Sequence, residues 1–241
     1  MEIYRIIGCP CLGVFSYKDA YEMVNSLLDR RLGGYSVAIN ALKVYKYNKE
    51  IGVKQIIENA ILQTPDGVAA VYGLRLQYNI KVIKLDLPGL VLDIANSRKS
   101  SLFILGATED SNMKAFYAIA KLYPGINICG RENGYFDDLK RLIKSLTLLQ
   151  PDIVLIAMGS PKQEIVSADL LKSLPNTLFV GCGGRIDVLA GKVHMAPVWI
   201  KENGLEWLYR SIKEPKRFLR NFVIFSWIIR KMLGIFFKKL V

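Results

Sequence analysis

Residues 102–110 read Leu102-Phe-Ile-Leu-Gly106-Ala-Thr108-Glu-Asp110, an apolar run that ends in glycine and passes at once into a helix start. A strand buried on both faces of a parallel sheet reads as such a continuous apolar run, and threonine is favoured at a helix N-cap. The same order returns in Ile156-Ala-Met-Gly159-Ser160-Pro161-Lys162-Gln163, where Ser160 and Gln163 have capping-box spacing and Pro161 stands at the first helical position. These junctions predict parallel strands joined by helices.

Short runs rich in β-branched residues alternate with longer stretches of helical periodicity along the rest of the chain. Predicted strands cover residues 35–39, 67–71, 102–106, 126–129, 153–158 and 178–181. Predicted helices cover residues 41–47, 53–62, 87–95, 111–122, 136–148, 161–171 and 198–211. This alternation predicts an α/β fold with a mostly parallel, Rossmann-like sheet and helices on both faces. Ligands of such sheets bind beyond the carboxyl ends of the strands, so residues that follow the strands are the first site candidates.

The length and charge of the chain divide it into a body and a tail. A chain of 241 residues that is 51% hydrophobic can bury a full core, and we predict one α/β domain over residues 1–208. The net charge is +12 at pH 7, and residues 210–241 hold nine Lys or Arg against one acid. The partner of the basic tail, residues 209–241, is therefore expected to be anionic.

The tail combines its positive charge with apolar side chains. In a helix, Arg210, Lys213, Arg217 and Arg220 would form one basic stripe, and a large apolar surface follows it from Phe218 onward. A charged stripe by itself is most often a solvated helix face, but an apolar surface of this size needs a lipid interface or a partner chain. We expect a C-terminal amphipathic helical appendage that contacts an anionic membrane surface. Charge alone would also suit a nucleic-acid binder, but no RNA-binding motif accompanies it, so no nucleic-acid partner is expected.

The cysteines and acidic residues give no sign of a metal site. Four cysteines show no CxxC spacing, the chain has one histidine, and no Asp-x-Asp pair occurs. We expect neither metal nor cofactor, and a reduced, cytoplasmic setting. The N-terminus lacks the pattern of a secretion signal, and no apolar run reaches the 18 or so residues of a spanning helix.

Several separated motifs resemble the WecG/TagA/CpsF family of glycosyltransferases. They are Met158-Gly-Ser-Pro-Lys-Gln-Glu164, Gly181-Cys-Gly-Gly-Arg-Ile-Asp187, Gly204-Leu-Glu-Trp-Leu-Tyr-Arg210 and Glu214-Pro-Lys-Arg217, in the family's order. The resemblance extends from about Tyr35 to Arg220, and the last twenty or so residues match in character only. It implies transfer of a sugar, of the N-acetylmannosamine type, from a nucleoside diphosphate donor to a lipid-linked acceptor.

The resemblance also implies which residues bind the donor. Taken alone, the glycine turns and the Ser160 box could be ordinary strand ends and helix caps, and Asp187 could be a cap as well. The family match places these segments on the nucleotide-sugar. The implied donor-binding residues are Asn40, Gly106, Ala107, Thr108, Met158, Gly159, Pro161, Lys162, Gln163, Glu164, Gly181, Gly183 and Asp187.

Asp66 is the candidate catalytic base. Pro65-Asp66-Gly67 is an ordinary turn sequence, but the resemblance places the family's proposed base at this aspartate. A carboxylate suits the task, because transfer of a glycosyl group requires removal of a proton from the attacking hydroxyl. The resemblance further implies that acceptor diphosphate or membrane is contacted by Lys81, Arg210, Arg217 and Arg220.

Four positions depart from the family pattern and bear on sugar specificity. Ala38 replaces a threonine, Lys81 replaces an arginine, and Ile83 and Lys84 alter the residues between Lys81 and Asp86. Lysine is not equivalent to arginine for bidentate contacts to a diphosphate.

The main hypothesis is an inverting, metal-independent glycosyltransferase, peripheral on the inner face of the cell membrane. Its expected donor is a UDP-N-acetylhexosamine or its uronate, and its expected acceptor is a polyprenyl-diphosphate-linked saccharide of a cell-surface or wall polymer. The alternative is a non-catalytic membrane adaptor that retains the nucleotide-binding fold. Association into homo-oligomers is left open.

Overall fold

A computed structural model describes residues 2–192 and 223–234. A six-stranded sheet forms its centre, and every pair of neighbouring strands in it is parallel. The strands lie in the order β4 (Leu62–Pro65), β3 (Gly34–Ile39), β8 (Leu178–Gly181), β7 (Ile153–Ala157), β5 (Ser101–Gly106) and β6 (Asn127–Glu132). The predicted α/β fold with a parallel, Rossmann-like sheet is therefore confirmed.

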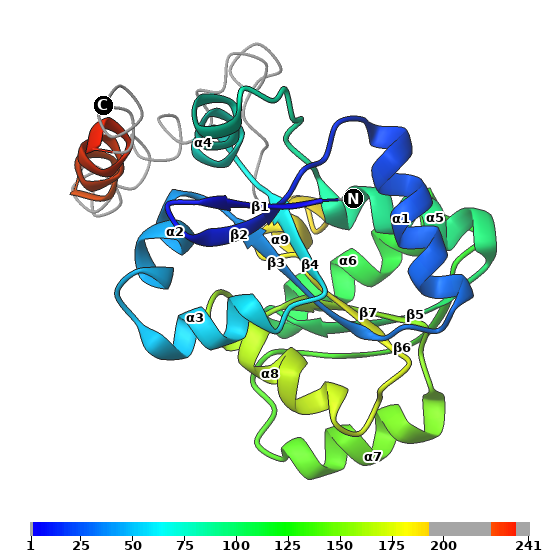
Figure 1. Cartoon of the computed structure of the whole chain (residues 1–241). Coiled ribbons are helices and arrows are strands. Elements are labelled where there is room, and N and C mark those ends of the chain that lie inside the picture. The colour runs from blue at the N-terminus through cyan, green and yellow to red at the C-terminus, as the bar shows by residue number, and fades with distance from the viewer. Residues whose placement is uncertain (1, 193–222, 235–241) are drawn as a thin grey trace.

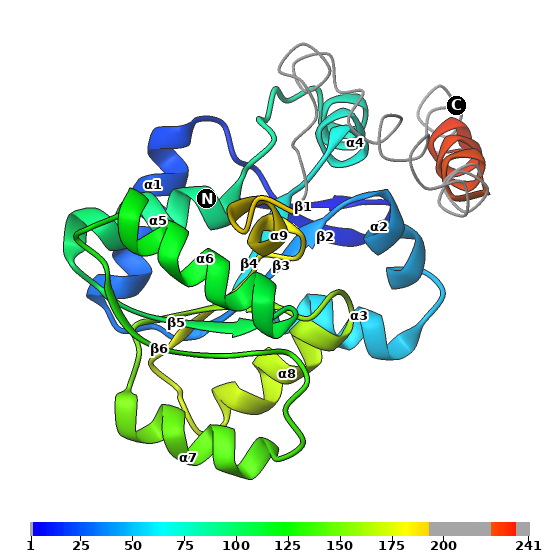
Figure 2. The same ribbon diagram turned by 180° about the vertical axis from the view of Figure 1, so that it is seen from behind.

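Helices cover both faces of the sheet (Figures 1 and 2). One face packs against α1 (Tyr17–Asp29), α5 (Leu87–Arg98), α6 (Glu109–Leu122) and α9 (Arg185–Leu189). The other packs against α2 (Ala41–Tyr47), α3 (Ile51–Glu58), α7 (Leu139–Leu149) and α8 (Lys162–Leu171). All five residues of β7 are buried, as expected for a central strand with a helix layer on each side.

A small antiparallel hairpin and one further helix lie beside the sheet. The hairpin consists of β1 (Ile3–Ile6) and β2 (Cys9–Leu12), and α4 (Val68–Tyr78) packs against it. A Cβ atom at Gly73 would lie 2.8 Å from the Ile6 side chain, so glycine allows α4 to approach the hairpin closely. Neither the hairpin nor α4 is among the predicted elements.

The predicted strand over residues 67–71 is wrong. These residues open α4, and the strand at this edge is β4, which overlaps the end of the helix predicted over 53–62. A short apolar run such as Val68-Ala-Ala-Val71 has no period that separates strand from helix. The sequence does not reveal β4 as a buried strand, because it contains the polar residues Gln63 and Thr64. The buried amide of Gln63 donates to the carbonyls of Ile57 and Ala60, which makes a polar residue acceptable there.

The two helix caps predicted at strand ends differ in outcome. The hydroxyl of Thr108 accepts a hydrogen bond from the Ser111 amide and caps α6, as predicted. Ser160 does not cap α8, because Pro161 occupies the N-cap position. Ser160 lies one residue before the N-cap, and its hydroxyl accepts no hydrogen bond from the amides of the first turn. The Ser160–Pro161 peptide bond is cis.

Residues 223–234 form a helix that contacts the body of the protein. The ring of Trp227 meets Tyr45 of α2 edge to face at a centroid distance of 5.3 Å, and Ile224 is buried. Part of the apolar tail surface is thus covered by the protein itself. The predicted helix 198–211 and the basic stripe of Arg210, Lys213, Arg217 and Arg220 lie outside the described residues. No helix in the described ranges has the length and hydropathy needed to span a bilayer.

Candidate active site

A cavity of about 440 Å³ opens at the carboxyl ends of β3, β4 and β8. The chain leaves β3 into α2 on one face of the sheet and leaves the adjacent β8 into α9 on the other face. Such a divergence of neighbouring strands is the place where open parallel sheets bind ligands. The cavity is lined by Ser36, Ala38, Asn40, Lys43, Thr64, Asp66, Lys84, Leu85, Asp86, Leu87, Pro88, Gly159, Ser160, Gln163, Glu164, Gly181, Cys182, Gly183, Gly184, Arg185 and Val188.

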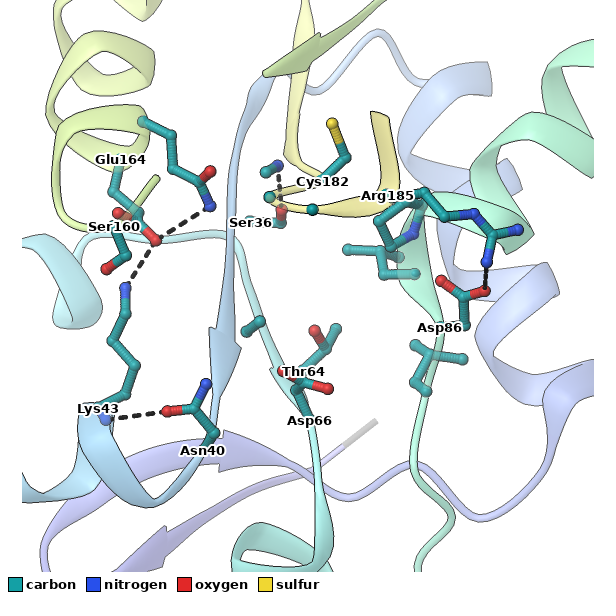
Figure 3. A pocket seen from close by; sticks show the side chains of 18 of the residues that line it. Ser36, Asn40, Lys43, Thr64, Asp66, Asp86, Ser160, Glu164, Cys182 and Arg185 are labelled. Carbon is teal, nitrogen blue, oxygen red and sulfur yellow. Dashed lines mark hydrogen bonds and ion pairs between the residues drawn. The ribbon is translucent and has the colours of Figure 1, made fainter. Parts of the chain in front are cut away.

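Asp66 lies in the middle of this cavity wall. It follows β4 directly, and its amide donates to the Ile39 carbonyl of β3 at 2.8 Å. Gly67 has a φ of 85°, a conformation that favours glycine, and lets the chain turn away into α4. Figure 3 shows Asp66 between two charged pairs, one on each side of the cavity. Its position is fixed by backbone contacts at the end of two adjacent strands.

The first charged pair joins α2 to α8. The ammonium group of Lys43 donates to Glu164 Oε1 at 2.6 Å, and the two side chains are only 6% and 2% exposed. Asn40 prepares this arrangement, because its side chain accepts from the Lys43 amide at 3.1 Å and caps α2. Glu164 Oε2 and Gln163 Oε1 are buried and have no hydrogen-bond partner among the described residues. Breaking the pair would leave a buried charge.

The second charged pair joins α9 to the start of α5. Arg185 Nη1 donates to Asp86 Oδ2 at 2.7 Å, and the other oxygen of Asp86 accepts from the Gly89 amide at 3.3 Å. Asp86 therefore caps α5 and holds the guanidinium group at the cavity wall at the same time. A guanidinium group held by one carboxylate retains further N–H donors, the groups that phosphate oxygens accept from.

Cys182 contributes a neutral surface to the cavity. Burial raises the pKa of its thiol to about 12, so the group stays protonated near neutral pH. It lines the cavity as a small apolar side chain rather than as a nucleophile. No group of three or more His, Cys, Asp or Glu side chains within residues 2–192 and 223–234 is arranged to hold a metal ion.

Comparison with known proteins identifies the family. The model of the WecG/TagA/CpsF glycosyl transferase family matches residues 4–238. The chain belongs to this family. A relative from Bacillus subtilis (strain 168) is 30% identical over 196 residues, which cover 80% of this chain and 77% of the relative. That relative is an N-acetylglucosaminyldiphosphoundecaprenol N-acetyl-beta-D-mannosaminyltransferase.

The WecG/TagA/CpsF match is longer than the motifs alone indicate. It includes residues 4–34, which contain α1 and all of the hairpin except Ile3, and it reaches residue 238 in the tail. The expected limits of Tyr35 and Arg220 are therefore too narrow. The tail is part of what this glycosyltransferase shares with its family.

The cavity of this WecG/TagA/CpsF member brings together seven of the fifteen predicted site residues that the structure describes. Those that line it are Asn40, Asp66, Gly159, Gln163, Glu164, Gly181 and Gly183. Those that do not line it are Lys81, Gly106, Ala107, Thr108, Met158, Pro161, Lys162 and Asp187. Lys84 rather than Lys81 reaches the wall. Arg210, Arg217 and Arg220 fall outside the described residues.

In the turn after β5, a backbone amide and the helix N-terminus already have partners within the protein. The Ala107 amide donates to the Ala157 carbonyl of β7 at 2.7 Å, so it is not free to hold a phosphate. The first turn of α6 carries Glu109, paired with Arg131, and Asp110, paired with Lys192. Carboxylates at a helix N-terminus occupy the position that an anionic ligand would take. This turn is thus less suited to a diphosphate than the cavity.

Sequence reasoning missed Lys43 and Arg185. Lys43 stands three residues after Asn40, and Arg185 lies inside the glycine motif between Gly181 and Asp187, so both were within segments already of interest. Asp187 itself accepts from the Ser111 hydroxyl at 2.9 Å and links α9 to α6. Arg185 could have been found from its position: it is the one charged residue next to the glycines that directly follow the predicted strand over residues 178–181.

Proposed function

We propose that this glycosyltransferase moves an N-acetylhexosamine, or its uronate, from a UDP-sugar to a polyprenyl-diphosphate-linked saccharide with inversion at the anomeric carbon. The observation that carries the proposal is the position of Asp66, a carboxylate at the centre of a cavity at the sheet's carboxyl edge. The B. subtilis relative is named as transferring N-acetylmannosamine to N-acetylglucosaminyldiphosphoundecaprenol, which supports the type of sugar transferred and the class of acceptor.

In the proposed reaction Asp66 acts as the general base. Its carboxylate takes the proton from the acceptor hydroxyl as that oxygen attacks the anomeric carbon. The bond from the anomeric carbon to the diphosphate breaks, and the electron pair leaves with UDP. Attack from the face opposite the leaving group gives inversion. Gly159, Gln163, Gly181 and Asn40 are the proposed donor contacts within the cavity.

The charge of the cavity supports a role for the tail. Its described lining holds three cations, Lys43, Lys84 and Arg185, against three acids, Asp66, Asp86 and Glu164. A diphosphate that enters would meet no net positive charge from these residues. We propose that Arg210, Arg217 and Arg220 of the tail, with Lys81, supply it to the acceptor or the leaving group, without a metal.

The proposed location is the inner face of the cell membrane, with the α/β domain, residues 1–208, in the cytoplasm. The tail, residues 209–241, would hold the protein there. A surplus of cations attracts anionic lipid by about 1 kcal/mol for each residue near the surface, and Val223, Ile229 and Leu233 are exposed on the described part of the tail.

The function is tested with the full chain, a synthetic polyprenyl-diphosphate-N-acetylglucosamine acceptor and a panel of UDP-N-acetylhexosamines and their uronates. We expect one donor to yield an α-to-β inverted disaccharide lipid, identified by mass spectrometry and NMR, at the same rate with and without EDTA. UDP binding without product from any donor would favour the adaptor, and loss of turnover in EDTA would contradict the metal-free mechanism.

Arg185→Ala is expected to weaken UDP binding about 10- to 100-fold, because a charge-assisted hydrogen bond contributes about 1.5–3 kcal/mol. Arg185→Lys should recover only part of the loss, since an ammonium group lacks the planar fork. Isothermal titration calorimetry with UDP measures both. Arg98→Ala is the control, because Arg98 pairs with Asp29 outside the cavity. Equal UDP affinity of Arg185→Ala and the unmodified protein would remove Arg185 from the donor site.

A further inference from the structure

Helix α4 carries large apolar side chains on two opposite sides but is covered on one side only. Ala70, Gly73 and Leu74 are buried on the side that faces the hairpin. On the opposite side the side chains of Tyr72 and Leu76 are 54% and 69% exposed. Tyr72 and Leu76 thus form an apolar surface that the described residues leave open.

Positive charge accompanies this open side. The guanidinium carbon of Arg75 lies 5.8 Å from the centre of the Tyr72 ring, so the cation and the two apolar side chains share one stripe of the helix. From Val68 to Leu85 the sequence contains Arg75, Lys81 and Lys84 and no acidic residue. Helices that lie in the headgroup region of anionic membranes have this composition, with aromatic residues, leucines and cations.

The open side of α4 lies near the cavity. The helix begins at Val68, immediately after the Asp66-Gly67 turn of the cavity. In both views α4 and the helix of residues 223–234 lie at one end of the molecule and α7 lies at the other (Figures 1 and 2). Val223, Ile229 and Leu233 of that helix are also exposed. Two apolar, basic surfaces thus occur at the end to which the cavity strands point.

We propose that the open side of α4 and the segment that follows it, residues 68–85, form a membrane-contact surface that binds an anionic lipid bilayer. Tyr72 and Leu76 enter the interface, and Arg75 and Lys81 lie against lipid phosphates. Together with the tail, this contact fixes the orientation of the protein as well as its attachment. The mouth of the cavity then faces the lipid surface. Only this last consequence rests on the proposed function, since lipid binding by α4 does not require catalysis.

The test is partitioning of the full chain onto vesicles that contain phosphatidylglycerol, compared with vesicles of phosphatidylcholine alone. Leu76→Glu is expected to weaken binding to the anionic vesicles about tenfold or more, because it removes a leucine that enters the lipid interface and adds a charge that anionic lipid repels. Leu148→Glu on α7 is the matched control. Leu148 is 79% exposed, so this variant makes the same chemical change at the opposite end of the molecule. Its binding should stay within about twofold of the unmodified chain.

Three results would overturn the proposal. They are equal partitioning of Leu76→Glu and the unmodified chain, equal weakening by Leu148→Glu, and equal binding to both vesicle types. A fourth outcome assigns another occupant: if Leu76→Glu lowers the mass measured by sedimentation equilibrium without lipid and leaves vesicle binding intact, α4 is a self-association surface. Thermal unfolding checks that each variant is folded. Asp66→Asn should bind vesicles normally, which separates failure of this proposal from failure of the proposed catalysis.

Discussion

Asp66→Asn should lower kcat by about a hundredfold to ten-thousandfold, the range that general-base catalysis contributes. Asparagine has the same shape and retains a hydrogen-bonding oxygen, but it cannot accept the proton of the attacking hydroxyl. The affinity for UDP should stay the same, because Asp66 acts on the acceptor oxygen. Initial rates of disaccharide-lipid formation, with UDP titrated separately by calorimetry, measure the two effects.

The control for this substitution is Asp169→Asn. Asp169 lies on the surface of α8 in a pair with Lys172, so the same chemical change there should leave turnover unaltered. A normal rate for Asp66→Asn would rule out Asp66 as the base. Asp86 would then be the next candidate, because it is the other carboxylate on the cavity wall that is not buried against a lysine.

The edge of the sheet that carries the site follows from the sequence only in part. Asn40 comes directly after the predicted strand over residues 35–39, and parallel strands place such positions at one edge. Asp66 precedes the strand predicted over residues 67–71, which would put it at the other edge, and it reaches the site because the real strand, β4, ends at Pro65. Local patterns therefore predict the place of a residue only where the strand itself is recognised.

The charged pairs of the site do not follow from the sequence in the same way. Lys43 and Glu164 are 121 positions apart, and Asp86 and Arg185 are 99 apart. The first pair forms because α8 packs against β3, the strand that leads into α2, and the second because α9 reaches the start of α5. Both arrangements are decided by the packing of the whole sheet. No periodicity or spacing within one segment encodes such a partner.

The turn at Gly106 illustrates the same limit. Its glycine and its threonine cap are readable locally, and both occur as predicted. Whether the Ala107 amide is free to bind a phosphate depends on Ala157, which stands on another strand. A Cβ at Gly106 would lie 2.4 Å from the Ala157 carbonyl oxygen, so the glycine is required by strand packing alone. A ligand-binding role is not needed to explain it.

Lys43→Met should lower the free energy of unfolding by about 3–5 kcal/mol, the usual cost of leaving one member of a buried ion pair alone. The Glu164 carboxylate would keep only the 3.4 Å contact with Gln163, and its Oε2 already has no partner among the described residues. For a chain of this size such a loss corresponds to a decrease in Tm of about 6–20 °C. Urea and thermal unfolding monitored by circular dichroism measure it.

A double-mutant cycle distinguishes the loss of a partner from the intrinsic value of the pair. Glu164→Leu combined with Lys43→Met removes both charges, and it should cost less than either single change because no unpaired charge is then buried. Lys46→Met is the control on the same helix. Lys46 pairs with Glu50 at the surface, where the two side chains are 31% and 47% exposed. Because a solvent-exposed ion pair adds little to the free energy of unfolding, its loss should change stability little. If Lys43→Met unfolds within about 0.5 kcal/mol of the unmodified protein, water from the cavity solvates Glu164, and the α2–α8 pair contributes nothing to the fold.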